Sequence, residues 1–200
     1  FNLDVDVFEQ NLIKLLNHEF ESNKLEKVRD VFVFACVTGM RFGELFLISK
    51  SNVSETEILL KEDKDTNKQV RSIPLTAISK RILIKYDYKL PLIANQKQNE
   101  YIKEVFKELD YKHKVQRVTT RGKENIKEEI EFYNRISTHT ARRTFITMMK
   151  RQGKSDKLIA KINKNKITFN TLDDKFKNDR EIILLLISHH SYDLEYVSPQ

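Results

Sequence analysis

The sequence has one cysteine, no tryptophan, four glycines and three prolines among 200 residues. A single cysteine, Cys36, excludes an internal disulfide framework and a cysteine-based metal site, so we expect a reducing, cytoplasmic environment. No apolar run approaches the roughly 18 residues that a membrane-spanning helix needs, and we expect no membrane partner. Linkers, internal repeats and low-complexity tracts are also lacking, which predicts a single domain over residues 1–200.

The composition that is present is that of a globular, basic chain. Hydrophobic residues make up 40% of it and charged residues 32%, and the net charge is +7. Such a balance supports a folded core rather than disorder. The excess of Lys and Arg indicates a polyanionic partner such as nucleic acid, although a merely solvated basic surface is the alternative.

The spacing of hydrophobic residues predicts a mainly helical chain with a small antiparallel sheet, an α+β fold. We expect Asp6, Asn95 and Ser155 to cap helix N-termini, and Gly39 and Gly153 to end helices. Short β-type runs at 57–61 and 69–75 predict a hairpin with a polar tip. The predicted helices span 6–20, 24–39, 76–90, 95–110, 138–153 and 155–162, and a short helix runs into a turn within 44–53. Residues 112–135 form a second hairpin or a long loop, and a terminal helix over 180–190 is one interpretation of the C-terminal segment.

Two short motifs place arginines beside apolar helices. In "TGMRFGEL" (38–45), Arg41 follows a helix-ending glycine, and Glu44 is either its structural partner or the group that orients it toward a ligand. In "STHTARRTF" (137–145), His139 and Arg142 are three residues apart and leave the same helical face. Arg143 points about 100° away. An internal salt bridge is the alternative for each buried arginine.

These residue types suit a phosphate group. The planar fork of arginine donates to two phosphate oxygens at once, and such donors stabilise the charge that a pentavalent phosphorane gains. A lysine from the hairpin tip, or a histidine, can protonate a leaving 5′ oxygen. No carboxylate cluster suggests two-metal chemistry, so we expect neither a metal nor a cofactor.

In their order and spacing the two motifs resemble the arginine motifs of the tyrosine recombinases, the phage-integrase family, over roughly residues 1–162. The resemblance implies that Arg41, His139 and Arg142 grip a scissile DNA phosphate, with Glu44 in support. It implies a hairpin lysine as general acid, either Lys64 or, as the fallback, Lys68. A tyrosine would form a 3′-phosphotyrosyl intermediate, so that strands are cleaved and rejoined without an external energy source.

The same resemblance implies the setting of the reaction. The expected partners are double-stranded DNA and further copies of the chain, with four subunits in a synapse. The expected role is site-specific recombination or integration of a bacterial mobile genetic element, in the cytoplasm at the nucleoid. The resemblance also implies a DNA-clamping domain that would precede Phe1 and is absent from this sequence.

The C-terminal segment 163–200 departs from the family pattern. The second histidine and the tyrosine nucleophile of the family fall on Asn163 and Leu172, or on Asn165 after a two-residue slip. Tyr196 is therefore the candidate nucleophile, and Tyr192 is its alternative. A terminal helix that packs on the domain itself or on a partner subunit, with its tyrosines inert, is the other interpretation, which makes the chain a catalytically inactive DNA-binding relative. A metal-free phosphodiesterase acting on small substrates is a third hypothesis.

Further cations are candidates for contacts with the DNA backbone. Residues 112–127 are rich in Lys and Arg, although acidic residues interrupt them. Arg143 is expected to face outward from the helix 138–153. His18 is expected at the surface or the edge of the core without a catalytic role, and His113 either is simply exposed to solvent or approaches the DNA backbone. The predicted DNA-binding residues are Lys114, Arg117, Arg121 and Arg143.

Overall fold

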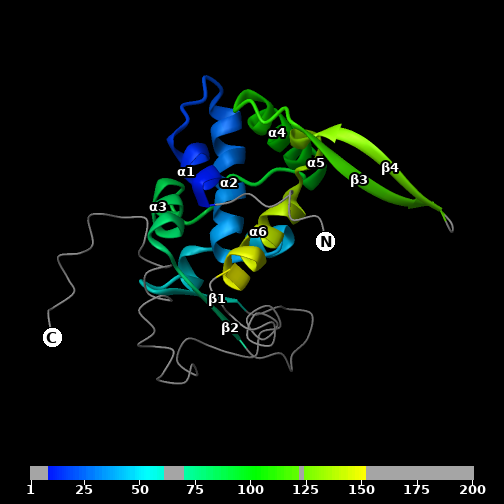
Figure 1. The fold of residues 1–200 in the computed structure, drawn as a ribbon. Helices are drawn as coiled ribbons and strands as arrows, with labels where there is room; N and C mark the ends of the chain where they lie inside the picture. The colour runs from blue at the N-terminus through cyan, green and yellow to red at the C-terminus, as the bar shows by residue number, and fades with distance from the viewer. Residues whose placement is uncertain (1–8, 61–69, 122–123, 152–200) are drawn as a thin grey trace, which may run out of the picture. The chain divides into compact units, whose positions relative to one another are not determined.

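The computed structural model describes residues 9–60, 70–121 and 124–151 (Figure 1). These residues build mainly helices and two antiparallel sheets of two strands each, which confirms the α+β prediction. The chain divides into two compact units. The first comprises residues 1–46 and 91–148, and the second comprises residues 47–90 and 149–200.

The core of the first unit forms around one long helix. Most of the side chains of α2 are buried, because apolar residues lie on every side of it rather than along one stripe. Phe32 on α2 meets Phe106 on α4 edge to face at 5.5 Å. Gln98 on α4 donates to the carbonyl of Val28 at 3.2 Å. The helices that belong wholly or mainly to this unit are α1 (Glu9–Asn17), α2 (Asn23–Thr38), α4 (Asn95–Glu108), α5 (Phe132–Arg135) and α6 (Thr138–Arg151).

The end of α1 lies earlier than the predicted end at residue 20. The buried Arg29 on α2 explains this difference, because its Nη1 donates to the carbonyls of Leu15 at 2.6 Å and Leu16 at 3.1 Å. A third hydrogen bond reaches the carbonyl of His18 at 3.3 Å. Carbonyls at a helix C-terminus lack partners within the helix, and a cation satisfies them well. A tertiary contact therefore ends α1.

Asn95 does not cap α4, so that prediction is wrong. Ala94 is the residue before the first turn, and no side chain caps it. Asn95 instead accepts a hydrogen bond at Oδ1 from Thr138 Oγ1 at 3.1 Å, and Asn99 Oδ1 accepts one from Thr138 N at 2.8 Å. Side chains of α4 thus hold the first residue of α6.

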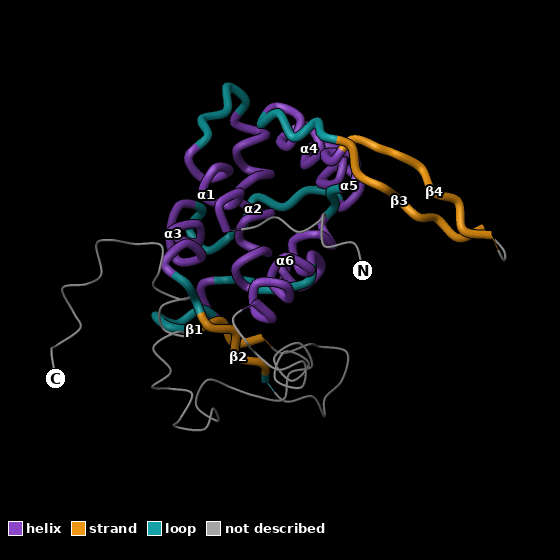
Figure 2. The backbone as a smooth tube through the Cα atoms, viewed as in Figure 1, coloured by secondary structure: helices purple, strands orange, loops and turns teal. Residues whose placement is uncertain are grey.

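Residues 112–135 form a hairpin rather than a loop. Strands β3 (Lys114–Arg121) and β4 (Glu124–Glu131) pair antiparallel, with Val115 opposite Ile130. Figure 2 shows this ribbon extending away from α4 and α5. The short helix α5 follows β4 and is tied to the start of the hairpin by Phe132 N, which donates to the carbonyl of His113 at 2.8 Å.

The second unit contains the other hairpin. Strands β1 (Glu57–Leu60) and β2 (Arg71–Pro74) pair antiparallel, which confirms the prediction. Helix α3 (Ala77–Lys85) begins with a capping box between Thr76 and Ser79. The helix stops five residues short of the predicted residue 90, because Asp87 and Tyr88 have positive φ angles of 46° and 62°.

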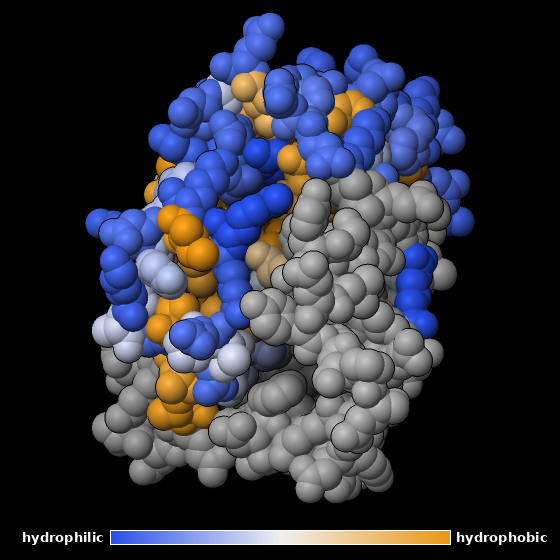
Figure 3. Space-filling view, turned by 90° about the vertical axis from the view of Figure 1, so that its left-hand side faces the viewer, coloured by the Kyte–Doolittle hydropathy of each residue, from blue (hydrophilic) through white to orange (hydrophobic). Residues whose placement is uncertain are grey.

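The short helix predicted to run into a turn within 44–53 takes 3₁₀ geometry, as η2 (Phe42–Leu47), and a second 3₁₀ segment, η3 (Lys50–Asn52), follows it. Gly153 and the predicted helices 155–162 and 180–190 lie outside the described residues. Within the described ranges, no helix combines the length and hydrophobicity needed to cross a membrane. Among the coloured residues on the face drawn in Figure 3, most are hydrophilic, and hydrophobic residues are exposed in separate areas.

Candidate phosphate-binding site

The turn after α2 requires a glycine for two reasons. Gly39 has a φ of 66°, a conformation that residues with a Cβ seldom adopt, and its N–H donates to the carbonyl of Ala35 at 3.0 Å. A Cβ at this position would also lie 2.5 Å from Cδ1 of Phe145 on α6. Helix α6 therefore packs directly against the backbone of the turn that carries Arg41.

Glu44 fixes the position of Arg41. The carboxylate of Glu44 is buried, and it accepts the backbone N–H of Arg41 at 2.7 Å and Nη1 of the same residue at 2.9 Å. The side chain of Arg41 is nonetheless 57% exposed. Only one of the five N–H donors of the guanidinium is engaged by Glu44, so the group is oriented while it still faces solvent. This geometry fits both interpretations of Glu44, as structural partner and as orienting group.

Arg142 reaches the same turn from α6. Its Nη1 donates to the carbonyl of Gly39, two residues before Arg41. This hydrogen bond joins residues that lie 103 positions apart in the sequence, and it uses one of the five N–H donors of the guanidinium. The structure thus brings the two arginine motifs to one turn, which is the arrangement that a shared target requires.

His139 lies one helical turn before Arg142, and its side chain is exposed. The first turn of α6 is held by the two asparagines of α4 and by Thr140, whose Oγ1 accepts from Ser137 N at 3.0 Å. Because the start of α6 is fixed, His139 and Arg142 keep their positions relative to the turn that carries Arg41. The positive end of the helix dipole also lies at this start, and it favours negative charge.

Cys36 is a structural residue. It is fully buried on α2, and burial raises the pKa of its thiol well above the usual range, while a hydrogen bond with the side chain of Thr144 on α6 lowers it by less. A thiol that stays protonated is a poor nucleophile. Cys36 and Thr144 therefore serve to fasten α6 to α2 beneath the site.

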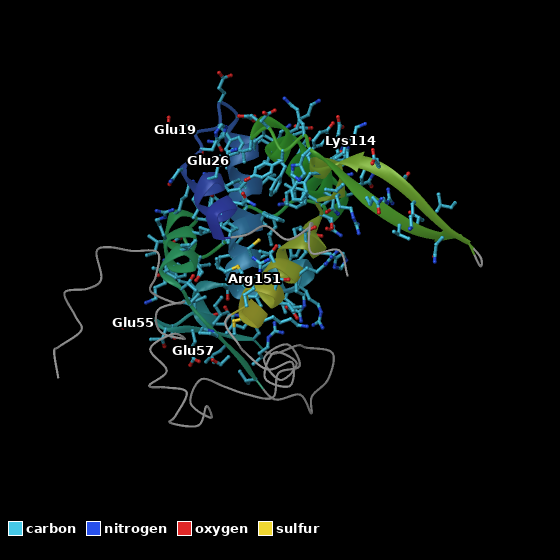
Figure 4. All side chains as sticks on the ribbon, viewed as in Figure 1. Glu19, Glu26, Glu55, Glu57, Lys114 and Arg151 are labelled. Carbon is cyan, nitrogen blue, oxygen red and sulfur yellow. The ribbon has the colours of Figure 1, made fainter. Side chains whose placement is uncertain are left out.

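The hairpin cations have acidic neighbours. Lys114, Arg117 and Arg121 all lie on β3, and their partners in register on β4 are Glu131, Glu128 and Glu124. Arg117 Nε lies 3.4 Å from Oε1 of Glu128. Figure 4 shows Lys114 at the end of the hairpin nearest α4 and α5, with oxygen- and nitrogen-tipped side chains extending along both strands. The hairpin thus presents mixed charge rather than a basic stripe.

Several predicted residues fall outside the described ranges: Lys64, Lys68, Tyr192 and Tyr196. Arg143 is described and is half-buried on α6. His113 is exposed and stacks on Phe132, with the ring centroids 4.6 Å apart, and His18 Nε2 forms a hydrogen bond with Glu108 Oε1 at 3.1 Å. Within the described part of the chain, no group of His, Cys, Asp and Glu is arranged to hold a metal ion.

Sequence reasoning missed Arg135. It lies on α5 four residues before His139, and its Nε is shielded from solvent without a hydrogen-bond partner among the described residues. An arginine in "FYNRIS" carries no motif, and its surroundings depend on the hairpin and on α6. No local pattern of residues therefore signalled it.

Comparisons with known proteins identify one family over most of the chain. The phage integrase family model matches residues 6–164, and a domain of unknown function (DUF4116) matches residues 158–200. A crystal structure of XerA recombinase is similar in fold, with a TM-score of 0.52 and 17% sequence identity. The match covers 92% of this chain and 63% of that one, so the chain spans less than two thirds of that recombinase. No curated protein matches the sequence.

Proposed function

Because the chain belongs to the phage integrase family, we propose that it contains the catalytic domain of a DNA strand-exchange enzyme, a tyrosine recombinase. The observation that carries this proposal is the hydrogen bond from Arg142 to the carbonyl of Gly39, beside Arg41. It supports a single phosphate as the target of both motifs. The proposed substrate is double-stranded DNA, with which the net charge of +7 agrees.

Arg41, Arg142 and His139 contact the non-bridging oxygens of one phosphodiester. Negative charge grows on these oxygens as phosphorus becomes pentavalent, so donors held in place beforehand stabilise that state more than the ground state. Glu44 contributes indirectly by fixing the guanidinium of Arg41. The oriented but exposed state of Arg41 supports this role.

The proton and bond changes involve residues outside the described ranges. The phenol of Tyr196 releases its proton to water, its oxygen attacks phosphorus, and the bond from phosphorus to the 5′ oxygen breaks. Lys64 gives the leaving oxygen its proton, with Lys68 as the alternative. A 3′-phosphotyrosyl bond results, and a 5′ hydroxyl of another strand reverses the steps. Four subunits assembled on two duplexes, at the bacterial nucleoid, would exchange the strands.

A catalytically inactive DNA-binding relative is the second candidate, and one observation favours it. The match to the phage integrase model ends at residue 164, and the model of unknown function covers the segment in which the nucleophile is expected. Leu172 occupies the position at which the family pattern places the tyrosine. In this case Arg41 and Arg142 bind DNA without cleaving it.

A covalent-capture experiment separates the two candidates. The full chain is incubated with a pool of nicked, random-sequence duplexes, which trap a cleaved strand on the protein, and adducts are collected under denaturing conditions. Adducts that disappear in Tyr196→Phe support the enzyme. DNA binding without adducts supports the inactive relative. Absence of binding by the unmodified chain contradicts both candidates.

A further inference from the structure

The outer part of the β3–β4 hairpin is exposed on both of its faces. Val115, close to the start of β3, is 7% exposed, whereas Val118 is 50% exposed and Ile126 on β4 is 41% exposed. Val118 lies opposite Lys127, and Ile126 lies opposite Thr119, so the two apolar side chains project from opposite faces of the ribbon. Figure 2 shows the ribbon extending away from the helices, and only its inner end is anchored by burial of Val115.

The two long edges of the hairpin carry backbone groups that point away from the partner strand. Among the described residues this sheet has two strands, so each strand has one open edge there. Phe132 N donates to the carbonyl of His113, which lies opposite it when the register is continued by one residue. Directly opposite residues that bond in this way alternate with residues whose N–H and C=O groups point outward. Val118 on β3 and Lys127 on β4 are therefore among the outward-facing residues.

The open edge of β4 is protected by charge, and the outer part of the β3 edge is not. Residues 127–129 of β4 read Lys-Glu-Glu, whereas residues 118–120 of β3 read Val-Thr-Thr. Charged residues and proline are the usual protection of an edge against another chain, and uncharged β-branched residues favour strand pairing. A hairpin of two strands is marginally stable by itself, and further strands stabilise it. The β3 edge is thus the one that accepts a further strand.

We propose that β3 pairs antiparallel with β3 of a second copy of this chain, about a twofold axis at Val118. The two hairpins then form one sheet in which β3 of each copy is central. Val118 lies opposite Val118 of the second copy, and these two exposed side chains cover each other. Arg117 lies opposite Thr119 of the second copy, and no charged residue of β3 lies opposite one of like charge.

The other pairings of two hairpins are unfavourable. Two β4 strands paired about Ile126, Lys127 or Glu128 place a charged residue opposite one of like charge, which destabilises the pair. Antiparallel pairing of β3 with β4 of a second copy requires both hairpins to point the same way. The copies would then lie two strand spacings apart, about 10 Å, which is the width of a single helix. With β3 against β3 the hairpins point in opposite directions, so the helices of the two copies lie at opposite ends of the sheet.

Disulfide formation by the full chain, without DNA, tests the register. The one cysteine of the sequence, Cys36, is buried, so a cysteine introduced on β3 is the reactive one. Val118→Cys places two Cα atoms about 5.5 Å apart across the axis, within the range of a disulfide. Thr119→Cys is the matched control, because its two copies lie beyond about 7 Å. Non-reducing gels after mild oxidation should show covalent dimers for Val118→Cys and about tenfold fewer for Thr119→Cys. Equal yields, or no dimer of Val118→Cys, overturn the inference.

Proline at two outward-facing positions tests the edge. Val118→Pro removes an N–H that points away from β4, so the hairpin keeps its own hydrogen bonds. Lys127→Pro is the matched control on the opposite edge. Sedimentation velocity of the full chain over a range of concentrations should show that Val118→Pro weakens self-association by about tenfold, as loss of the central hydrogen bonds predicts, and that Lys127→Pro leaves it unchanged. Equal effects, or an unmodified chain that stays monomeric, overturn the inference.

The inference goes beyond the proposed function, because the pairing requires no DNA, and the two fail separately. Dimers that depend on Val118 support the inference even if the unmodified chain binds no duplex, in which case only the proposed function fails. If Val118→Pro weakens binding of a DNA duplex and leaves self-association unchanged, the edge binds DNA and the inference is overturned. Should circular dichroism show that Val118→Pro does not fold, the comparison of Val118→Cys with Thr119→Cys decides.

Discussion

The turn after α2 and the β3–β4 hairpin both carry basic side chains near acidic ones, but they differ in how firmly these side chains are held. At the turn, Arg41 is held by a buried carboxylate and Arg142 by a backbone carbonyl. On the hairpin, Lys114 and Arg117 of β3 are exposed and lie opposite Glu131 and Glu128 of β4 in the strand register. The difference teaches that fixed position, rather than abundance of charge, distinguishes a candidate site from a solvated surface.

Gly39→Ala should have the largest effect, because it breaks the packing on which the turn depends. The substitution forces a Cβ into the left-handed region and against Phe145. We expect the free energy of unfolding to fall by about 2–4 kcal/mol, measured by urea denaturation. Gly43→Ala is the matched control, because a Cβ there meets nothing within 4 Å. Equal losses in both variants would contradict the packing of α6 on this turn.

Arg142→Ala tests the function of the turn against that of the hairpin. Its DNA affinity should fall by about 1.5–3 kcal/mol, the value of a charge-assisted hydrogen bond. Lys114→Ala should cost about 0–1 kcal/mol, as is usual for an exposed charge. Anisotropy at a fixed salt concentration measures both. A larger loss of DNA affinity for Lys114→Ala than for Arg142→Ala would indicate that the hairpin, rather than the turn, binds DNA.

Two ion pairs give a smaller but direct comparison. Glu44→Gln keeps the size of a buried side chain and removes the charge that orients Arg41, so unfolding free energy should fall by about 1–2 kcal/mol. Glu128→Gln on the hairpin removes a partner of Arg117 that is 46% exposed, and the change should stay within about 0.5 kcal/mol. Chemical denaturation of both variants provides the test, and similar losses would refute the contrast.

The smallest effect concerns Asp110, just before the hairpin. A hydrogen bond from Lys112, followed by its positive charge, lowers the pKa of this exposed carboxyl. A depressed pKa in the folded state stabilises the fold at pH values above the unfolded pKa, and this contribution is lost as the pH falls through the folded value. Lys112→Ala should raise the pKa of Asp110 in an NMR titration. An unchanged pKa would show that the pair does not persist in solution.

Local patterns predicted much of the fold. Helix α2 and its glycine end, the β1–β2 hairpin and α6 follow from hydrophobic spacing and turn residues within a few positions of one another. For residues 112–135 the sequence left a hairpin and a long loop as alternatives. The predictions failed where a distant residue intervenes. Arg29 ends α1 from another helix, and Asn95 holds Thr138 instead of capping its own helix.

The residues of the candidate site also fall into those that local patterns predicted and those that they did not. Motif spacing identified Arg41, Glu44, His139 and Arg142, because each pair lies within one helical turn or one tight turn. It did not identify Arg135, whose neighbours come from β3 and α6. The cations in 112–127 were predicted as candidates for contacts with the DNA backbone, with acidic residues between them. The sequence does not reveal which of these acids lie opposite which cations in a hairpin.

The sequence by itself determined the family, the helical segments and the two arginine motifs, because these depend on residue types at short spacing. Only the tertiary structure decided that both motifs reach one turn, that the hairpin charges oppose one another, and that Arg135 stands among like charges. The physical reason is that hydrogen bonds and electrostatic interactions depend on distance in space, and chain folding sets that distance between residues as far apart as Gly39 and Arg142.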